Sequence, residues 1–169
     1  MITQEQEAWI SQLGDKPTYV VPYDPHSERL FALTKKRVTK ALGMQLIVEH
    51  SGASGLGISG QDEIDVTIVA NKEQFDEYIP KLEKEFGAVR KRYADRARFE
   101  VREEGKKIDL KISDASHANY LSGKKFESYL RQHPEDLERY RILKEKLSGS
   151  STKDYYRKKT EFINDILSR

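Results

Sequence analysis

Residues 48–66, which read VEHSGASGLGISGQDEIDV, are the part of the sequence that is most informative about the fold. It overlaps an apolar segment, 44–49, that is rich in Leu, Ile and Val and is typical of a strand. Residues 51–61 then hold four glycines and three serines in eleven positions, which predicts a loop with special backbone conformations. Residues 63–70 alternate apolar and polar side chains, so a second strand is expected directly after the loop.

One helix is predicted before this strand–loop–strand unit in the sequence, and another is predicted after it. The pair Asp24-Pro25 is typical of a helix start, with Asp24 as the cap, and Gly43 is typical of the helix end. After the second strand, Asn71 is positioned to cap another helix, and Gly87 to end it. Both helices carry apolar residues at helical spacing, so each is expected to bury one face against the strands.

The rest of the chain continues with strands and then with helices. Three extended segments are predicted, at 88–93, 97–103 and 107–112. From residue 114 onward apolar residues recur at helical spacing. We therefore expect an α/β (α+β) protein with a mixed sheet flanked by helices and a helical C-terminal third. We expect one domain over 1–169, with an α/β core at 20–113 and a helical part at 114–169 packed on it.

Composition narrows the classes of protein. The chain has 169 residues, 30 basic against 28 acidic, for a net charge of +2. The absence of cysteine excludes disulfides, thiolate metal sites and cysteine nucleophiles. No apolar run approaches the roughly 20 residues of a membrane span, and no secretory signal is evident at the N-terminus. We expect a cytoplasmic protein with no membrane partner.

Basic residues gather in one segment, 87–111. They are Arg90, Lys91, Arg92, Arg96, Arg98, Arg102, Lys106, Lys107 and Lys111. Their positive potential could receive a polyphosphate. The alternative is a solvated sheet edge, where Lys and Arg discourage aggregation. Because the total charge is nearly neutral, nucleic acid is not expected as a partner.

Three carboxylates are candidates for chemistry. Glu63 and Asp65 share the polar face of one strand, and Asp109 lies on the polar face of another. If the two strands are neighbours, the three carboxylates lie close together and repel one another. Such a cluster is usually stabilised by a divalent metal ion. In the alternative, Lys107 and Lys111 neutralise Asp109, and Glu63 is simply exposed.

The order strand, Gly/Ser loop, acid-x-acid strand, helix and later acid resembles the nucleotidyltransferase fold of polymerase-β-like enzymes. Their glycine motif would correspond to Ser51-Gly52-Ala53, and their acid pair to Glu63 and Asp65. Two residues depart from the pattern, since Ala53 replaces a Gly or Ser and Glu63 stands where Asp is usual. A second register, with Asp65 as the first acid and Thr67 in the second place, would leave the metal site incomplete.

The resemblance implies a site. Glu63, Asp65 and Asp109 would be the catalytic and metal-binding residues, with Mg²⁺ or alternatively Mn²⁺ as the cofactor. The substrate-binding residues would be Gly52, Ala53, Ser54 and Lys111. Ser54 has no evident general base in the sequence, so it is not expected to be a nucleophile.

Most of the chain also resembles the GrpB family, small proteins with this same fold. The likeness rests on three segments and the tail: residues 21–25, 48–54 continuing to 64–66, 126–147 and 155–167. The family names a fold better than a reaction, although fusions of some relatives to dephospho-CoA kinase imply nucleotide or cofactor metabolism. The family's late histidine pair is replaced here by Asp109 and Lys111, which restores the third acid of the wider pattern.

Two functions are therefore expected to compete. The first is magnesium-dependent transfer of a nucleotidyl group from a nucleoside triphosphate to an unknown acceptor. The second is a non-catalytic, regulatory module that binds a nucleotide or cofactor and docks a protein partner through its C-terminal helices. The departures at Ala53 and Glu63 favour the second.

Overall fold

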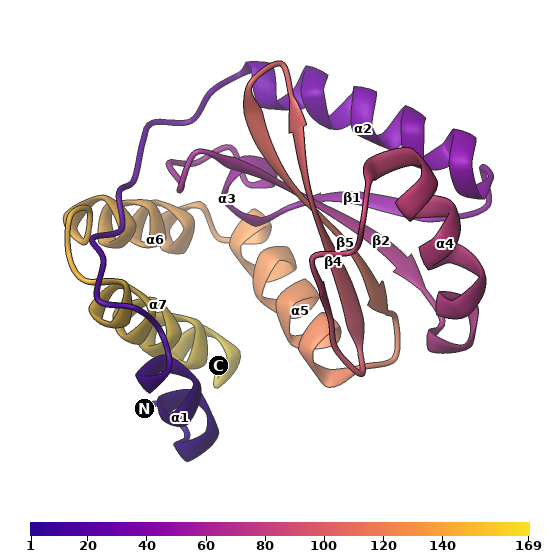
Figure 1. Ribbon diagram of the computed structural model, residues 1–169. Coiled ribbons are helices and arrows are strands. Elements are labelled where there is room, and N and C mark those ends of the chain that lie inside the picture. The colour runs from indigo at the N-terminus through magenta and orange to yellow at the C-terminus, as the bar shows by residue number, and fades with distance from the viewer. The chain divides into compact units, whose positions relative to one another are not determined.

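The computed structural model describes residues 1–169, and the chain divides into two compact units (Figure 1). The sheet unit comprises Tyr23–Gly57 and Asp62–Leu121. The helical unit comprises Met1–Pro22, Ile58–Gln61 and Ser122–Arg169. The chain thus crosses between the units four times, and the four residues 58–61 of the Gly/Ser segment belong with the helices.

The sheet unit is built on a five-stranded mixed sheet in the order β1-β2-β5-β4-β3. Its elements are α2 (His26–Leu42), β1 (Ile47–Ser51), α3 (Gly52–Gly55), β2 (Glu63–Ala70), η1 (Lys72–Gln74), α4 (Phe75–Phe86), β3 (Lys91–Arg92), β4 (Arg96–Glu103) and β5 (Lys106–Asp114). Only β2 and β5 run parallel, and the other neighbouring strands are antiparallel. The predicted mixed sheet flanked by helices is confirmed.

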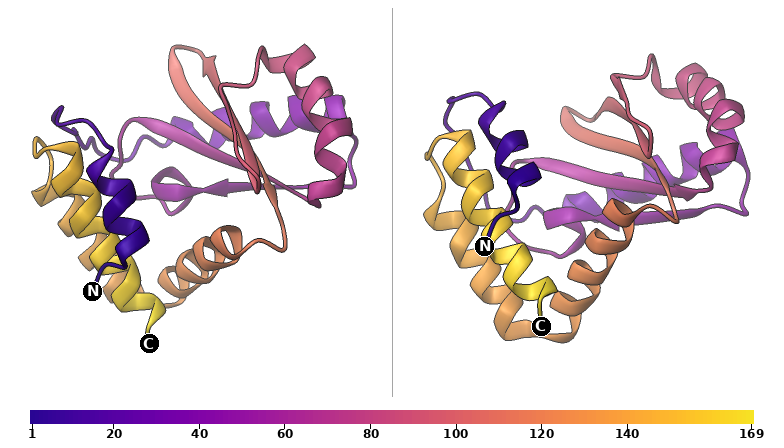
Figure 2. Two further views of the ribbon diagram at one scale, coloured as in Figure 1. Left: turned by 60° about the horizontal axis from the view of Figure 1, so that its bottom comes forward. Right: turned by 90° about the horizontal axis from the view of Figure 1, so that it is seen from below.

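The core of the sheet unit lies between one face of the sheet and helices α2 and α4 (Figures 1 and 2). Ile64, Val66 and Ile68 of β2 are completely buried there, as alternation in a half-buried strand predicts. Gly43 and Gly87 follow the two helices with φ of +103° and +93°, a backbone region that favours glycine, so the helices end where expected.

The opposite face of the sheet is polar. We call it the polar face and define it by alternating residues of three adjacent strands. They are Glu63, Asp65 and Thr67 of β2, Lys107, Asp109 and Lys111 of β5, and Arg96, Arg98 and Glu100 of β4.

The helical unit packs α1 (Gln4–Ser11), α6 (Pro134–Lys146) and α7 (Thr152–Leu167) together (Figure 2). Helix α5 (Ala118–Gln132) begins in the sheet unit and ends here. Aromatic rings form much of the core, and the centroid of Phe126 lies 5.2 Å from that of Tyr140. The prediction of one domain over 1–169, with an α/β core at 20–113 and a helical part at 114–169, stays a prediction. No helix has the length and apolar character needed to cross a membrane.

Three local predictions are wrong. The first strand begins at Ile47 and runs to Ser51 instead of spanning 44–49, because Met44 and its neighbour occupy a turn in which Met44 is exposed. The loop predicted from residue 51 begins instead with the helical turn α3. The N-cap of α2 is Pro25, which makes no side-chain cap hydrogen bond, instead of the predicted Asp24. Asp24 Oδ1 nevertheless accepts a hydrogen bond from the backbone N–H of His26 at 3.0 Å.

Candidate functional site

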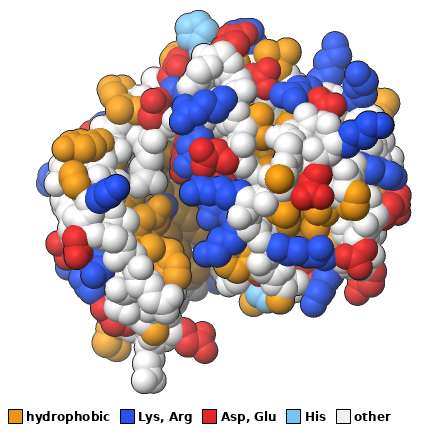
Figure 3. Space-filling model, in the orientation of Figure 1, with side chains coloured by type: hydrophobic (Ala, Val, Ile, Leu, Met, Phe, Trp, Pro, Cys, Tyr) orange, Lys and Arg blue, Asp and Glu red, His pale blue; other side chains and the backbone are white.

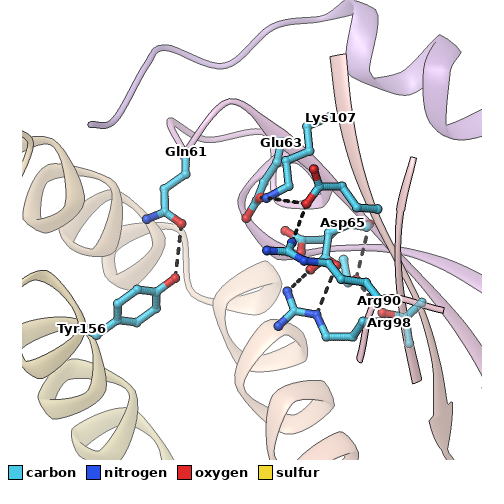
Figure 4. Close-up of polar contacts among 11 residues, drawn as sticks. Gln61, Glu63, Asp65, Arg90, Arg98, Lys107 and Tyr156 are labelled. Atoms are coloured by element: carbon cyan, nitrogen blue, oxygen red, sulfur yellow. Dashed lines mark hydrogen bonds and ion pairs between the residues drawn. The ribbon is translucent and has the colours of Figure 1, made fainter. Parts of the chain in front are cut away.

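Strand register brings the predicted carboxylates together on the polar face. Asp65 of β2 is the direct partner of Asp109 of β5, and Glu63 is the partner of Lys107 (Figure 4). Neighbouring strands lie about 4.8 Å apart, so two ionised carboxylates at this spacing repel by about 3 kcal/mol at an effective dielectric constant of about 20. Such a pair needs a nearby cation.

The chain supplies that cation itself. Arg98 of β4 donates two hydrogen bonds to the carboxylate of Asp109, from Nε to Oδ1 at 3.2 Å and from Nη2 to Oδ2 at 2.5 Å. Asp109 is only 6% exposed, so this fork satisfies a carboxylate that has little access to water. Lys107 Nζ lies 2.9 Å from Oε2 of Glu63. The alternative that Lys107 and Lys111 neutralise Asp109 is therefore wrong.

Arg98 is held in its charged form by the carboxylates around it. Burial by itself lowers the pKa of Arg98, but the hydrogen bonds and charge of Asp109, with the charge of Asp65, raise it above its usual value. Figure 4 shows Arg98 and Asp65 beside one another on this face. The guanidinium therefore pairs directly with Asp109 and interacts with Asp65 through its charge.

These residues, as arranged, do not fit a divalent metal. Magnesium needs carboxylate oxygens that are free to coordinate it and a site with excess negative charge. Asp109 and Glu63 each carry an ion pair with a cation of the chain. No three His, Asp or Glu side chains are placed to hold a metal ion together. The assignment of Glu63, Asp65 and Asp109 as catalytic metal ligands stays a prediction.

The glycine turn is shaped by contacts within the chain. Gly52 has a φ of +67°, and a Cβ at this position would collide with the carboxylate of Asp65. A Cβ at Gly55 would collide with the backbone carbonyl of His50. Close approach to β1 and β2 therefore accounts for both glycines. Substrate binding by Gly52 and its neighbour Ala53 stays a prediction.

Ser54 has partners that the sequence did not reveal. Its Oγ lies 3.0 Å from Nε2 of His50, whose Nδ1 lies 3.3 Å from Oε1 of Glu28. The His50 ring also stacks on Phe31 of α2, with 4.7 Å between centroids. Because Ser54 is only 6% exposed, this chain of contacts holds the α3 turn against α2 and keeps the hydroxyl inside. Substrate binding by Ser54 stays a prediction.

Lys111 is the uncommitted cation of the polar face. Its register partners are Thr67 on β2 and Arg98 on β4, so it lies in the middle of the sheet. Its side chain is half-buried, and its ammonium group makes no ion pair and no hydrogen bond. This ammonium group is therefore available to an anionic ligand, as the substrate-binding prediction requires.

Most of the basic segment is neutralised by neighbouring acids. Six of its nine cations form ion pairs with carboxylates: Arg90, Arg92, Arg96, Arg98, Lys106 and Lys107. Figure 3 shows Lys and Arg side chains interspersed with Asp and Glu on the face that it presents. This arrangement favours a solvated sheet edge over a continuous nucleic-acid surface.

A buried carboxylate lies just before β4. Burial raises the pKa of Asp95, but a hydrogen bond from Asn119 and the charge of Arg96 outweigh it and bring the pKa below its usual 3.8. His117 Nδ1 also lies 3.3 Å from Oδ2 of Asp95. These contacts fix the start of α5 against the turn between β3 and β4.

The sheet order, the flanking helices and the acids at β2 and β5 define a nucleotidyltransferase-like fold. A solved structure of the Cid1 poly(U) polymerase with MgGTP bound matches with a TM-score of 0.52 and 9% identity over 84% of this chain and 46% of that chain. The conserved protein GrpB from Enterococcus faecalis matches with a TM-score of 0.70 and 20% identity over 88% of this chain and 94% of that chain.

The sequence itself places the chain in a family. The model of the GrpB protein family matches residues 17–169, so the chain belongs to the GrpB family. The resemblance expected from the sequence, in family and in fold, is confirmed. No curated protein matches the sequence.

Proposed function

We propose that this protein is a non-catalytic module that binds the phosphate groups of a nucleotide or a nucleotide-derived cofactor on the polar face of its sheet. The observation that carries the proposal is Lys111, a half-buried lysine whose ammonium has no carboxylate partner, beside Arg98. A buried charge is costly unless it is paired, so a site that holds an unpaired cation favours an anionic ligand. Phosphate oxygens are strong acceptors for such a group.

The fold supports a nucleotide as the source of the phosphate. The solved structure of Cid1, which shares this fold, is described with MgGTP bound and with selectivity for UTP. In this chain the paired states of Glu63 and Asp109 favour binding over catalysis, because no free carboxylate pair is left to activate an attacking hydroxyl.

The test is thermal unfolding with a panel of nucleoside triphosphates and coenzyme A in the presence of EDTA. A ligand at about 100 times its dissociation constant stabilises the fold by about 2.7 kcal/mol. Lys111→Met should lose that stabilisation, whereas Lys84→Met, on an exposed position of α4, should keep it. The proposal is wrong if no compound stabilises the wild type, or if Lys111→Met responds as the wild type does.

Magnesium-dependent nucleotidyl transfer is the second candidate. It is favoured by the direct pairing of Asp65 with Asp109 across β2 and β5. It would require Arg98 to release Asp109 when substrate binds. The test is transfer of an α-³²P-labelled nucleotidyl group with Mg²⁺ or Mn²⁺. A labelled product that disappears in Asp65→Asn would establish this activity.

A regulatory module must also pass its ligand state to a partner. Helices α6 and α7, which belong to the helical unit, are the elements that we propose for docking. Ile142 of α6 is an exposed apolar side chain in this region, 36% accessible. Loss of a crosslinked complex on Ile142→Glu would support docking there.

A further inference from the structure

Arg98 occupies the place where the paired acids of this fold need a cation. Asp65 and Asp109 are direct partners on adjacent parallel strands. Arg98 reaches Asp109 from β4, which lies on the other side of β5 from β2. Its fork uses both oxygens of Asp109, and the charge of Asp65 adds to the positive character of the group.

We propose that Arg98 is a built-in substitute for a divalent cation, so that the polar face takes up its ligand without a metal. Ligand binding without a metal rests on the proposed function, whereas the exclusion of a metal from the acid pair does not depend on it. Arg98 is a positioning residue in this view, because it fixes the acids and leaves Lys111 to meet the ligand.

Charge balance supports the substitution. The polar face carries four carboxylates, Glu63, Asp65, Glu100 and Asp109, and four cations, Arg96, Arg98, Lys107 and Lys111. The face therefore has no net negative charge to attract a divalent ion. A metal could reach Asp109 only by displacing a guanidinium whose planar fork matches the carboxylate.

An arginine at position 98 can pair with a carboxylate in a way that a lysine cannot. A lysine ammonium is a point charge that can pair with one oxygen at a time, whereas a guanidinium engages two in a fixed plane. Arg98 keeps 38% of its side chain exposed, so its outer edge remains accessible to solvent or ligand. The same residue can therefore neutralise Asp109 and stay near a phosphate at Lys111.

The test uses Mn²⁺ alone, with free ion followed by electron paramagnetic resonance. The wild type should bind no Mn²⁺ below millimolar concentration. Arg98→Ala should bind Mn²⁺ at least tenfold more tightly, because Asp65 and Asp109 lose their cation. Arg98→Gln, which keeps hydrogen-bond donors without the charge, should gain affinity in the same direction and decides the matter if Arg98→Ala does not fold.

Two controls assign the gain to the acid pair. Arg98→Ala with Asp109→Asn should lose the gain. Arg90→Ala, which removes the nearer of two cations paired with the more exposed Glu100, should not show it. The proposal is overturned if the wild type already binds Mn²⁺ through Asp65, or if a folded Arg98 variant gains nothing. Since no nucleotide is present, failure of nucleotide binding and failure of this proposal are separate results.

Discussion

Removal of the Arg98 side chain should destabilise the protein by about 2–3 kcal/mol. Breaking a buried ion pair by removing one partner costs about 3–5 kcal/mol, because the other charge is left without compensation. Asp109 is 6% exposed, but the Arg98 side chain is 38% exposed, so water recovers part of that loss. For a chain of 169 residues this predicts a fall in Tm of about 4–12 °C.

The assay is denaturant unfolding of a double-mutant cycle with Arg98→Ala and Asp109→Asn. The double variant should be more stable than the sum of the single losses predicts, because Asp109→Asn removes the charge that Arg98→Ala strands. Arg90→Ala is the matched control, since that pair is 61% and 36% exposed and should cost less than about 1 kcal/mol. If Arg98→Ala is as stable as the wild type, or if the two losses of unfolding free energy are strictly additive, the Arg98–Asp109 pair does not stabilise the fold as argued.

Three further substitutions test the fold around the site and in the helical unit. Gly52→Ala should cost about 1–3 kcal/mol in unfolding free energy, because the positive φ and the Asp65 carboxylate leave no room for a Cβ. Asp95 has a lowered pKa, so its stabilisation is present above about pH 3.8 and is lost as the pH falls through the folded value; Asp95→Asn should therefore flatten the acid limb of a stability–pH curve. Lys144→Met should cost about 1–3 kcal/mol in thermal unfolding, because Lys144 is 2% exposed and donates to the carbonyl of Ser59.

Local sequence pattern was sufficient to predict β2 and the ends of α2 and α4. The alternation of residues 63–70 gave β2, and the glycines at 43 and 87 gave the ends of α2 and α4. These signals are local because they depend on the period of a strand and on the backbone freedom of glycine. The start of β1 was missed, since the apolar run 44–49 fits a strand equally well two or three residues earlier and only pairing with β2 sets the register.

The ion pairs of the site could not be predicted from local sequence pattern. Asp109 has lysines at both i−2 and i+2, so the sequence suggested Lys107 and Lys111 as its partners. The sheet order instead puts β4 beside β5, so Arg98 of β4 pairs with Asp109. Lys107 pairs with Glu63. Cross-strand partners depend on register and strand order, and a single sequence specifies neither directly.

Metal-free binding at Lys111 can be measured by isothermal titration calorimetry of the wild type and Lys111→Met with the nucleotide from the panel that stabilises the wild type most, in EDTA and again in Mg²⁺. The wild type should bind with similar affinity in both buffers, and Lys111→Met should lose at least tenfold in affinity. Binding that appears only with Mg²⁺, and that Lys111→Met leaves intact, would contradict metal-free binding at Lys111.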